Sequence, residues 1–324
     1  MSILNKINYN LYRAKYRYGK ELSSYGLIKT PVDVSLELSS ECNMACEYCY
    51  HSDQDKLPFK KGIMSLNTGM KIIKQSSEIG VNSLKFNWKG ESTINPHFKE
   101  LTEYAKNLSH GNVFIDRLTN SNFKFRNDRD DIFDGLCNQT KVKVSYDSFM
   151  KDVFETQRAK GDHDLTTKNI DKFYNYPKRK DTEIVIQAVR TKLNKNEDIE
   201  SLCKSRWPSA TISIRDMVGG RVDKDLDKLE DKKRDLSNRQ SCIQAHVRII
   251  FNWEGKAFPC CPDIEEKLCL GDINKESIYE IFNNQKSKIL KNKLLDKTAF
   301  NQFSSCMNCS SFESYANYKP SWVS

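Results

Sequence analysis

The stretch Glu41-Cys-Asn-Met-Ala-Cys-Glu-Tyr-Cys-Tyr-His51 carries three cysteines within eight residues. So short a loop can turn the thiolates of Cys42, Cys46 and Cys49 towards one point, as an iron–sulfur cluster or a zinc ion requires. A closed structural zinc site uses four ligands, whereas a cluster held by three cysteines keeps one iron open for a cofactor or substrate. A zinc-binding loop and three buried thiols are the alternatives to a cluster at this point.

The length and composition favour one large domain, or one large and one small domain. The chain has 324 residues, of which 38% are hydrophobic and 29% are charged. No apolar run has the length of a membrane span and the N-terminus lacks a secretory signal, so we expect a cytoplasmic protein. Eleven cysteines without an export signal indicate metal ligation rather than disulfides.

The net charge of +9 could indicate binding to nucleic acid, to an acidic membrane surface or to an anionic substrate such as a nucleotide sugar. The lysines are spread along the chain rather than gathered in one block, which favours a solvated basic surface.

Six segments have the alternation and composition of strands, and helical segments separate them. The expected strands cover residues 32–38, 83–88, 113–118, 141–146, 183–190 and 211–217. The expected helices cover residues 65–79, 97–108, 166–174 and 197–204. Strands that alternate with helices imply right-handed crossovers and a parallel sheet. The predicted fold class is therefore α/β, a partial (β/α)6 TIM-like barrel, with its site at the C-terminal ends of the strands.

Residues 1–30 alternate tyrosines with lysines and arginines, which predicts a basic helix followed by a turn at Gly26. This helix could lie on an anionic surface or membrane, or it could pack across the open end of the barrel.

The spacing C-x3-C-x-aromatic-C, with Tyr48 as the aromatic residue, resembles the signature of the radical S-adenosylmethionine (SAM) enzymes. The resemblance implies that Cys42, Cys46 and Cys49 hold a [4Fe–4S] cluster whose fourth iron is chelated by SAM. One electron then cleaves SAM to methionine and a 5′-deoxyadenosyl radical, which abstracts a hydrogen atom. A flavodoxin or ferredoxin-type electron donor is implied as a partner.

Loops at the ends of the later strands extend the resemblance. Gly90-Glu91 looks like the second half of the family's Gly-Gly-Glu motif, which holds the SAM amino group, with Lys89 in place of the first glycine. Thr119-Asn120 resembles the family's Thr-Asn-Gly, and the sequence from Ser145 to Ser148 resembles Ser-x-Asp-small, whose serine lies near the SAM ribose. Arg158 matches an arginine near SAM or the substrate, and is also a catalytic candidate. The implied cofactor-binding residues are Tyr48, Gly90, Glu91, Thr119, Asn120, Ser145, Asp147 and Arg158.

A second group of cysteines follows a polar, charge-dense segment, residues 221–240, which reads as a linker. Strand-like residues 247–251 and 256–260 flank a turn and predict a hairpin that brings Cys242 and Cys260 together. The pair Cys306-x2-Cys309 completes a four-ligand site.

This second region resembles the SPASM and twitch extensions of radical SAM enzymes. The resemblance rests on Gly255-x4-Cys260, on the Leu-Gly-Asp-Ile turn at residues 270–273 and on the helix after it. The longer SPASM form adds further cysteines, but none follows Cys309, which implies one auxiliary [4Fe–4S] cluster on Cys242, Cys260, Cys306 and Cys309. A structural zinc ion on the same thiolates is the alternative. The predicted domains are an N-terminal extension (1–30), the barrel (31–220), the linker (221–240) and a small cysteine-rich domain of hairpin and helix (241–324).

Cys261 and Cys269 remain unassigned inside this domain. They could be buried packing residues, or one of them could be a catalytic thiol that returns hydrogen to a substrate radical and so gives epimerisation. Cys137 and Cys203 lie on predicted helices between strands and are expected in the core.

The function that follows is radical SAM oxidation or epimerisation of a carbohydrate-like small molecule. Thirty residues ahead of the barrel are too few for a leader-peptide-binding domain, which favours a small, sugar-like or anionic substrate over a peptide. Peptide modification by a radical SAM enzyme is the first alternative. A zinc-bearing nucleic-acid-binding protein is the second, but it does not explain six strands with motifs at their C-terminal ends.

Overall fold

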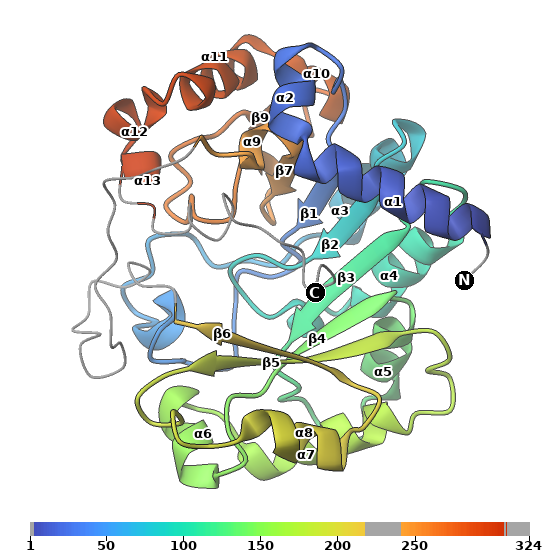
Figure 1. The fold of residues 1–324 in the computed structure, drawn as a ribbon, viewed down its shortest axis with the longest axis vertical. Helices are drawn as coiled ribbons and strands as arrows, with labels where there is room; N and C mark the ends of the chain where they lie inside the picture. The colour runs from blue at the N-terminus through green and yellow to red at the C-terminus, as the bar shows by residue number, and fades with distance from the viewer. Residues whose placement is uncertain (1–2, 218–240, 308, 310–324) are drawn as a thin grey trace.

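The computed structural model describes residues 3–217, 241–307 and 309, and within them nine strands form one sheet in the order β6-β5-β4-β3-β2-β1-β7-β8-β9 (Figure 1). The strands are β1 (Asp33–Leu36), β2 (Ser83–Phe86), β3 (Asp116–Ser121), β4 (Lys141–Ser145), β5 (Glu183–Arg190), β6 (Thr211–Asp216), β7 (Arg248–Phe251), β8 (Lys256–Phe258) and β9 (Gly271–Asp272). Strands β1 to β6 are parallel and lie in chain order, so the predicted six-stranded α/β barrel sheet is confirmed.

Helices connect these strands. Those of the N-terminal extension and barrel are α1 (Ile3–Arg17), α2 (Gly19–Ser24), α3 (Leu66–Glu78), α4 (Phe98–Asn107), α5 (Asp130–Cys137), α6 (Lys151–Gln157), α7 (His163–Tyr174) and α8 (Ile199–Arg206), with short 3-10 helices at Tyr50–Ser52 and Ser92–Ile94. The later ones are α9 (Gln244–Val247), α10 (Ile278–Asn283), α11 (Gln285–Leu295), α12 (Ala299–Gln302) and α13 (Ser304–Met307).

Alternation along the strands gives the sheet one apolar face. Val34 and Leu36 of β1 and Val142 and Val144 of β4 belong to the hydrophobic core, together with side chains of α3, α4, α5, α7 and α8. The intervening residues of each strand point to the other, inner face of the curved sheet, because successive side chains of a strand alternate. The helices therefore cover the outside of the barrel (Figure 1).

The third strand differs from its prediction. It begins at Asp116 rather than Val113, because residues 111–115 form a turn in which Phe114 has φ of +49°. Thr119 and Asn120 consequently lie inside β3 instead of following it. Helix α5 was predicted only as a helix that contains Cys137, and helix α6 was not predicted. The predicted linker, residues 221–240, lies outside the described residues.

The N-terminal helix α1 packs across the N-terminal ends of the strands. Tyr12 Oη donates to Asp116 Oδ2 at the start of β3 over 3.4 Å, and Arg248 Nη2 at the start of β7 donates to Tyr16 Oη over 3.0 Å. The predicted turn follows at Gly26, where φ is +68°. None of the described helices has the length and apolar character that crossing a membrane requires.

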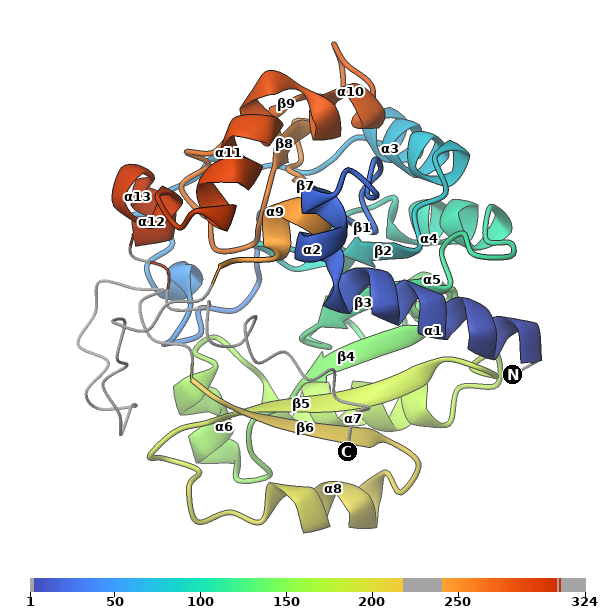
Figure 2. The ribbon, with the colours of Figure 1, turned by 45° about the horizontal axis from the view of Figure 1, so that its top comes forward.

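The C-terminal hairpin extends the barrel sheet instead of standing apart from it. Strand β7 pairs in parallel with β1, and β8 then pairs antiparallel with β7 across a turn that ends at Gly255, where φ is +87°. Helices α10 to α13 lie beside this hairpin, far from α6 to α8 at the other edge of the sheet (Figure 2). A capping box between Ser277 and Glu280 starts α10.

Candidate active site

The cysteine loop leaves the C-terminal end of β1 and is held on two sides. The backbone N–H of Ala45 donates to the carbonyl of Ala159, after α6, at 2.7 Å. Asn43 Nδ2 donates to the carbonyl of Lys124, after β3, at 2.5 Å. These contacts fix the loop at the end of the sheet where the sites of parallel barrels lie.

The three thiols of this loop are buried or half-buried and influence one another. Burial, supported by Cys49 and Asp147 and opposed by the charge of Arg158, raises the pKa of Cys46 to about 12. Burial, and next the charge of Glu91, raise the pKa of Cys42 above its usual range. Three adjacent thiols that share one environment fit a [4Fe–4S] cluster, whose positive irons would stabilise the thiolate forms.

Two nitrogen donors from other loops point at these sulfurs. Arg158 Nη1 lies 3.8 Å from Cys46 Sγ, and Asn122 Nδ2 lies 3.9 Å from Cys42 Sγ. Asn122 is also tied to the loop through Asn43 Oδ1, at 2.7 Å. The sequence analysis singled out Arg158 but not Asn122, although Asn122 follows β3 at the same rim as the other motifs.

Asp147, after β4, holds Arg158 in place. The Asp147 side chain is fully buried; its Oδ1 accepts from Arg158 Nη2 and from the backbone N–H of Val189, each at 2.9 Å. Its Oδ2 accepts from Tyr48 Oη of the cysteine loop. Burial alone would lower the pKa of Arg158, but Asp147, Tyr48 and Cys46 together raise it, so the guanidinium stays charged. Tyr48, Asp147 and Arg158 thus form one buried unit that reaches the sulfur of Cys46.

The Gly90-Glu91 loop is packed against the start of the cysteine loop. A Cβ on Gly90 would lie 2.3 Å from the carbonyl oxygen of Glu41, so only glycine permits this approach. Glu91 accepts from Thr93 Oγ1 at 2.7 Å and from the backbone N–H of Asn122 at 2.8 Å. Glu91 therefore orders two loops, and its predicted role in holding the SAM amino group stays a prediction.

The remaining predicted cofactor contacts separate into two groups. Thr119 is buried and donates to the carbonyl of Phe86 at 2.9 Å, which joins β3 to β2. Asn120 and Ser145 lie on the opposite, inner face of the sheet, as the pairing of Asn120 with Lys143 requires. Asn120 Oδ1 is buried there without a hydrogen-bond donor. The structure therefore places Asn120 and Ser145, but not Thr119, where a ligand inside the barrel could meet them.

The C-terminal cysteines also converge. Burial, supported by the neighbouring Cys309, Cys306 and Cys261, raises the pKa of Cys242 to about 12. Cys260 has a raised pKa from burial, to which Asp263 and Cys242 contribute. Asp263 Oδ1 also accepts from Ser305 Oγ at 2.6 Å, which fastens the segment bearing Cys306 to the one bearing Cys260.

No three of the described His, Cys, Asp or Glu side chains converge closely enough to hold a single metal ion. Cysteines that hold a [4Fe–4S] cluster each bind a different iron, and their sulfurs stand further apart than the ligands of one ion.

The two unassigned cysteines occupy different surroundings. Cys261 lies among the C-terminal cysteines, and its carbonyl accepts from Trp88 Nε1 at 3.0 Å. Cys269 Sγ donates to the carbonyl of Gly271 at 3.6 Å, and the groups that influence its pKa after burial are Lys286, Lys256 and Glu266. A hydrogen-donor role for either cysteine stays a prediction.

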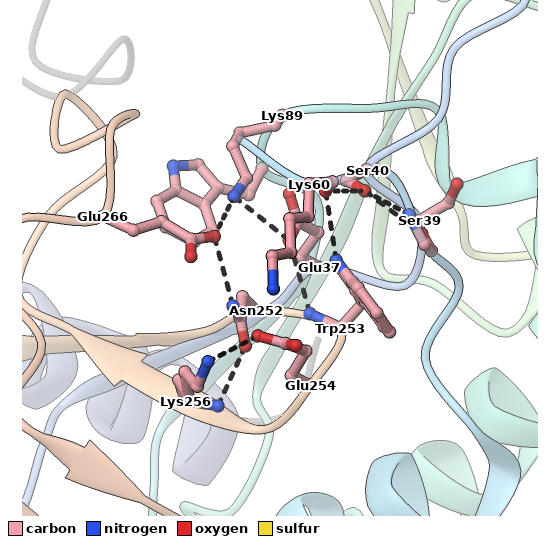
Figure 3. Close-up of polar contacts among 12 residues, drawn as sticks. Glu37, Ser39, Ser40, Lys60, Lys89, Asn252, Trp253, Glu254, Lys256 and Glu266 are labelled. Atoms are coloured by element: carbon pink, nitrogen blue, oxygen red, sulfur yellow. Dashed lines mark hydrogen bonds and ion pairs between the residues drawn. The ribbon is translucent and has the colours of Figure 1, made fainter. Parts of the chain in front are cut away.

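Lys89, the residue in place of the first motif glycine, joins the barrel rim to the C-terminal region (Figure 3). Its side chain is fully buried and pairs with Glu37 Oε2 at 3.5 Å and with Glu266 Oε1. The ammonium also lies 4.1 Å from the ring centroid of Trp88 and 4.6 Å from that of Phe59. The sequence analysis missed this role; a lysine between Trp88 and Gly90 was the available signal.

Around Lys89 the two regions share further hydrogen bonds. Asn252 Nδ2 donates to Glu266 Oε1 at 3.1 Å, and the backbone N–H of Trp253 donates to Glu37 Oε2 at 3.3 Å (Figure 3). The end of β1, the loop after β2 and the β7–β8 turn therefore form one polar network.

Comparison with known proteins adds two findings. Residues 242–310 match the SPASM family model, described as an iron–sulfur cluster-binding domain. A search of curated proteins found no match.

Solved structures share the fold over most of the chain. One is BtrN in complex with AdoMet and 2-DOIA, with 14% identity, a TM-score of 0.55, and 86% of this chain and 92% of that chain covered. Another is Streptococcus suis SuiB bound to the precursor peptide SuiA, with 14% identity, a TM-score of 0.64, and 90% and 72% covered. A third is anSMEcpe with bound AdoMet, with 16% identity, a TM-score of 0.62, and 82% and 81% covered. The predicted barrel and the predicted C-terminal iron–sulfur domain are thereby confirmed.

Proposed function

We infer that this chain, which combines the radical SAM fold with a C-terminal SPASM iron–sulfur cluster-binding domain, cleaves SAM reductively and abstracts hydrogen from a substrate carbon. The observation that carries the inference is the convergence of Arg158 and Asn122 on the sulfurs of a three-cysteine loop at the strand ends. In this proposal Cys42, Cys46 and Cys49 hold a [4Fe–4S] cluster. That cluster supplies the electron that converts SAM to methionine and a 5′-deoxyadenosyl radical.

The chain's own residues prepare this site. Arg158 places a positive charge and an N–H donor beside the sulfur of Cys46, and Asn122 donates to the sulfur of Cys42. Hydrogen bonds to ligand sulfurs tune the reduction potential of a cluster. Asp147 fixes the guanidinium, while Tyr48 ties the cysteine loop to the same carboxylate. The backbone around Gly90 is available for the amino group of SAM.

We assign the auxiliary [4Fe–4S] cluster to Cys242, Cys260, Cys306 and Cys309, where it would accept an electron from the substrate. The reaction class we propose is dehydrogenation or epimerisation of a carbohydrate-like small molecule. Support comes from the inner face of the sheet, where Asn120, Ser145 and Gln187 present polar side chains to which no described residue is hydrogen-bonded. Such groups suit the hydroxyls of a sugar.

A second candidate, peptide modification, is favoured by a different observation. Among the solved structures reported above, the highest TM-score, 0.64, belongs to SuiB bound to the precursor peptide SuiA.

Anaerobic reconstitution with iron and sulfide tests the proposal. We expect about eight irons per chain, and 5′-deoxyadenosine and methionine after reduction in the presence of SAM. Zinc without iron, or intact SAM after reduction, would falsify the proposal.

Product analysis in deuterated water then separates the reaction classes. A new carbonyl indicates dehydrogenation, and solvent deuterium on carbon indicates epimerisation through a thiol such as Cys261 or Cys269. A flavodoxin or ferredoxin-type protein is the proposed electron donor.

A further inference from the structure

The inner face of the barrel sheet is charged, and near the N-terminal ends of the strands its charges are paired. Asp33 of β1 pairs with Lys85 of β2 and with Arg248 of β7, the latter at 3.1 Å. Lys141 of β4 pairs with Glu183 of β5 at 3.1 Å. These ion pairs link neighbouring strands and leave little capacity for a ligand.

Two to four residues further along the strands the inner face changes character. Lys143 of β4 has no hydrogen-bond or ion-pair partner among the residues that the structure describes. Arg215 of β6 is exposed and pairs in register with Val189 of β5, four residues beyond the partner of Lys143. Among the described residues it donates only within its own strand, from Nε to Ser213 Oγ at 3.3 Å. On the strands beside Lys143, Asn120 Oδ1 is buried without a donor, and Gln187 makes no side-chain hydrogen bond to a described residue. The inner side of the sheet therefore carries two cations and two amides whose side chains have no partner on another described strand. They are Lys143, Arg215, Asn120 and Gln187.

The surroundings of Lys143 disfavour its own charge. Burial, followed by the charges of Arg215, Lys85 and Lys141, lowers the pKa of Lys143 to about 7; Asp116 acts weakly in the opposite sense. Asp116 already accepts hydrogen bonds from Tyr12 and Ser83. A mostly buried ammonium among other cations is costly unless an anion compensates it.

We propose that Lys143 and Arg215 form an anion-binding site inside the barrel that receives a phosphate or carboxylate group of the substrate, with Asn120 and Gln187 as neutral hydrogen-bonding partners. That the anion belongs to the substrate rests on the proposed function, but the existence of the anion site does not.

The position of the site matches this role. Lys143, Ser145 and Asp147 follow one another on the same side of one chain segment, and four residues of strand span about 13 Å. Asp147 holds the arginine that contacts Cys46. A small molecule anchored at Lys143 by its anionic end therefore extends towards the cysteine loop, where hydrogen abstraction is proposed.

The test uses pyridoxal 5′-phosphate, an aldehyde that carries a phosphate, on the anaerobic holoenzyme at pH 7. The aldehyde condenses with a neutral lysine amine and releases water, and borohydride reduces the resulting imine to a stable amine. Because Lys143 combines a lowered pKa with an anion site, we expect pyridoxal 5′-phosphate to modify it saturably and faster than the exposed Lys151. Peptide mass spectrometry measures the modification of both lysines. Inorganic phosphate should protect Lys143, whereas chloride at equal ionic strength should not.

Variants show whether both cations belong to the site. In Arg215→Met the phosphate concentration for half-protection should rise about tenfold, as expected for one charge-assisted hydrogen-bonding partner. Arg126→Met, which removes an exposed arginine paired with Asp128, is the matched control and should change nothing. Iron content and circular dichroism confirm that each variant is folded. Protection by succinate as well as by phosphate would show that the same site also accepts a carboxylate group.

Three results would overturn the proposal. They are modification of Lys143 no faster than that of Lys151, no protection by phosphate, and protection by SAM accompanied by lost SAM binding in Lys143→Met. The last would assign the cations to the cofactor. Failure of the proposed function is distinguishable, because a protein that binds phosphate at Lys143 but never forms 5′-deoxyadenosine keeps the site and loses the chemistry.

Discussion

The two groups of cysteines are built in opposite ways. Cys42, Cys46 and Cys49 come from one loop of eight residues behind a single strand, whereas Cys242, Cys260, Cys306 and Cys309 come from a helix start, a strand end and a terminal helical segment. The ligands of the first group come from one segment of the barrel, although contacts from the ends of β3, β4 and α6 hold that segment. The second forms only after the hairpin, α10 to α13 and the Asp263–Ser305 contact have assembled. The first group of cysteines is therefore part of the barrel. The second group depends on the folding of the region that follows the barrel.

The regions are nevertheless connected. Strand β7 is paired with β1, and Lys89 lies between Glu37 of the barrel and Glu266 of the C-terminal region. The two groups of cysteines are therefore connected through the contact around Lys89. Variants can test each group and this contact separately.

The largest expected difference is between Cys46→Ala and Cys306→Ala. The first should abolish 5′-deoxyadenosine formation and leave the auxiliary iron bound, because only the local site loses a ligand. The second should lose the auxiliary iron and still cleave SAM without turning over substrate. Iron content and 5′-deoxyadenosine are measured for both, with Cys137→Ala, outside either group, as the control. Complete loss of iron in either variant would mean that the two groups form one composite site.

Lys89→Met tests the contact between the regions. Methionine fills a similar volume but leaves the buried Glu37 and the partly exposed Glu266 without their cation; loss of one partner of a buried ion pair costs about 3–5 kcal/mol. We expect this loss in the free energy of unfolding, measured by urea denaturation of the anaerobic holoenzyme, with the C-terminal region losing its iron first. The control Lys99→Met removes an exposed pair with Asp134 and should cost about 0–1 kcal/mol. Equal stability of the two variants would show that Lys89 does not bind the regions together.

Arg158→Gln sharpens the role of the local site. Glutamine removes the charge beside Cys46 and one partner of Asp147, while Cys46 itself remains. Losing a residue that orients metal ligands typically costs about 10- to 100-fold, so we expect that loss in 5′-deoxyadenosine formation with the iron content unchanged. The reduction potential of the cluster should shift as well, which a purely structural role would not cause. Arg206→Gln, whose exposed arginine pairs with Asp171, is the control.

The local construction of the first site explains why the sequence predicted it well. The spacing from Cys42 to Cys49 and the alternation in residues 32–38 are short-range signals, and both match the structure. Ser65 and Gly80 likewise predicted the limits of α3, since Ser65 caps the helix and Gly80 has φ of +72°. Where a turn intervened, as at Phe114, hydrophobic alternation alone placed the strand too early.

The contacts that join distant segments could not be predicted in this way. Asn122 reaches Cys42 only because β3 lies two strands from β1, and Lys89 reaches Glu266 only because β7 adds to the sheet edge. Nothing in the order of residues distinguishes Lys143, which has no partner in the described part of the chain, from Lys141, which pairs with Glu183. That difference depends on the register of β4 against β3 and β5.

The smallest expected effect is the pH dependence that Glu37 confers. Burial raises the pKa of Glu37 to about 7, with Lys89 opposing and Glu266 adding to the rise. Between the ordinary carboxyl value and pH 7, the folded state holds a proton that the unfolded chain has lost, so the free energy of unfolding falls as pH rises. Glu37→Gln removes this titration and should reduce the stability difference between pH 5.5 and pH 7.5 by roughly 2 kcal/mol, measured by urea denaturation. Glu200→Gln, on the exposed face of α8, should retain the wild-type difference. If Glu37→Gln also retains it, the carboxylate is ionised throughout and Lys89 dominates its surroundings.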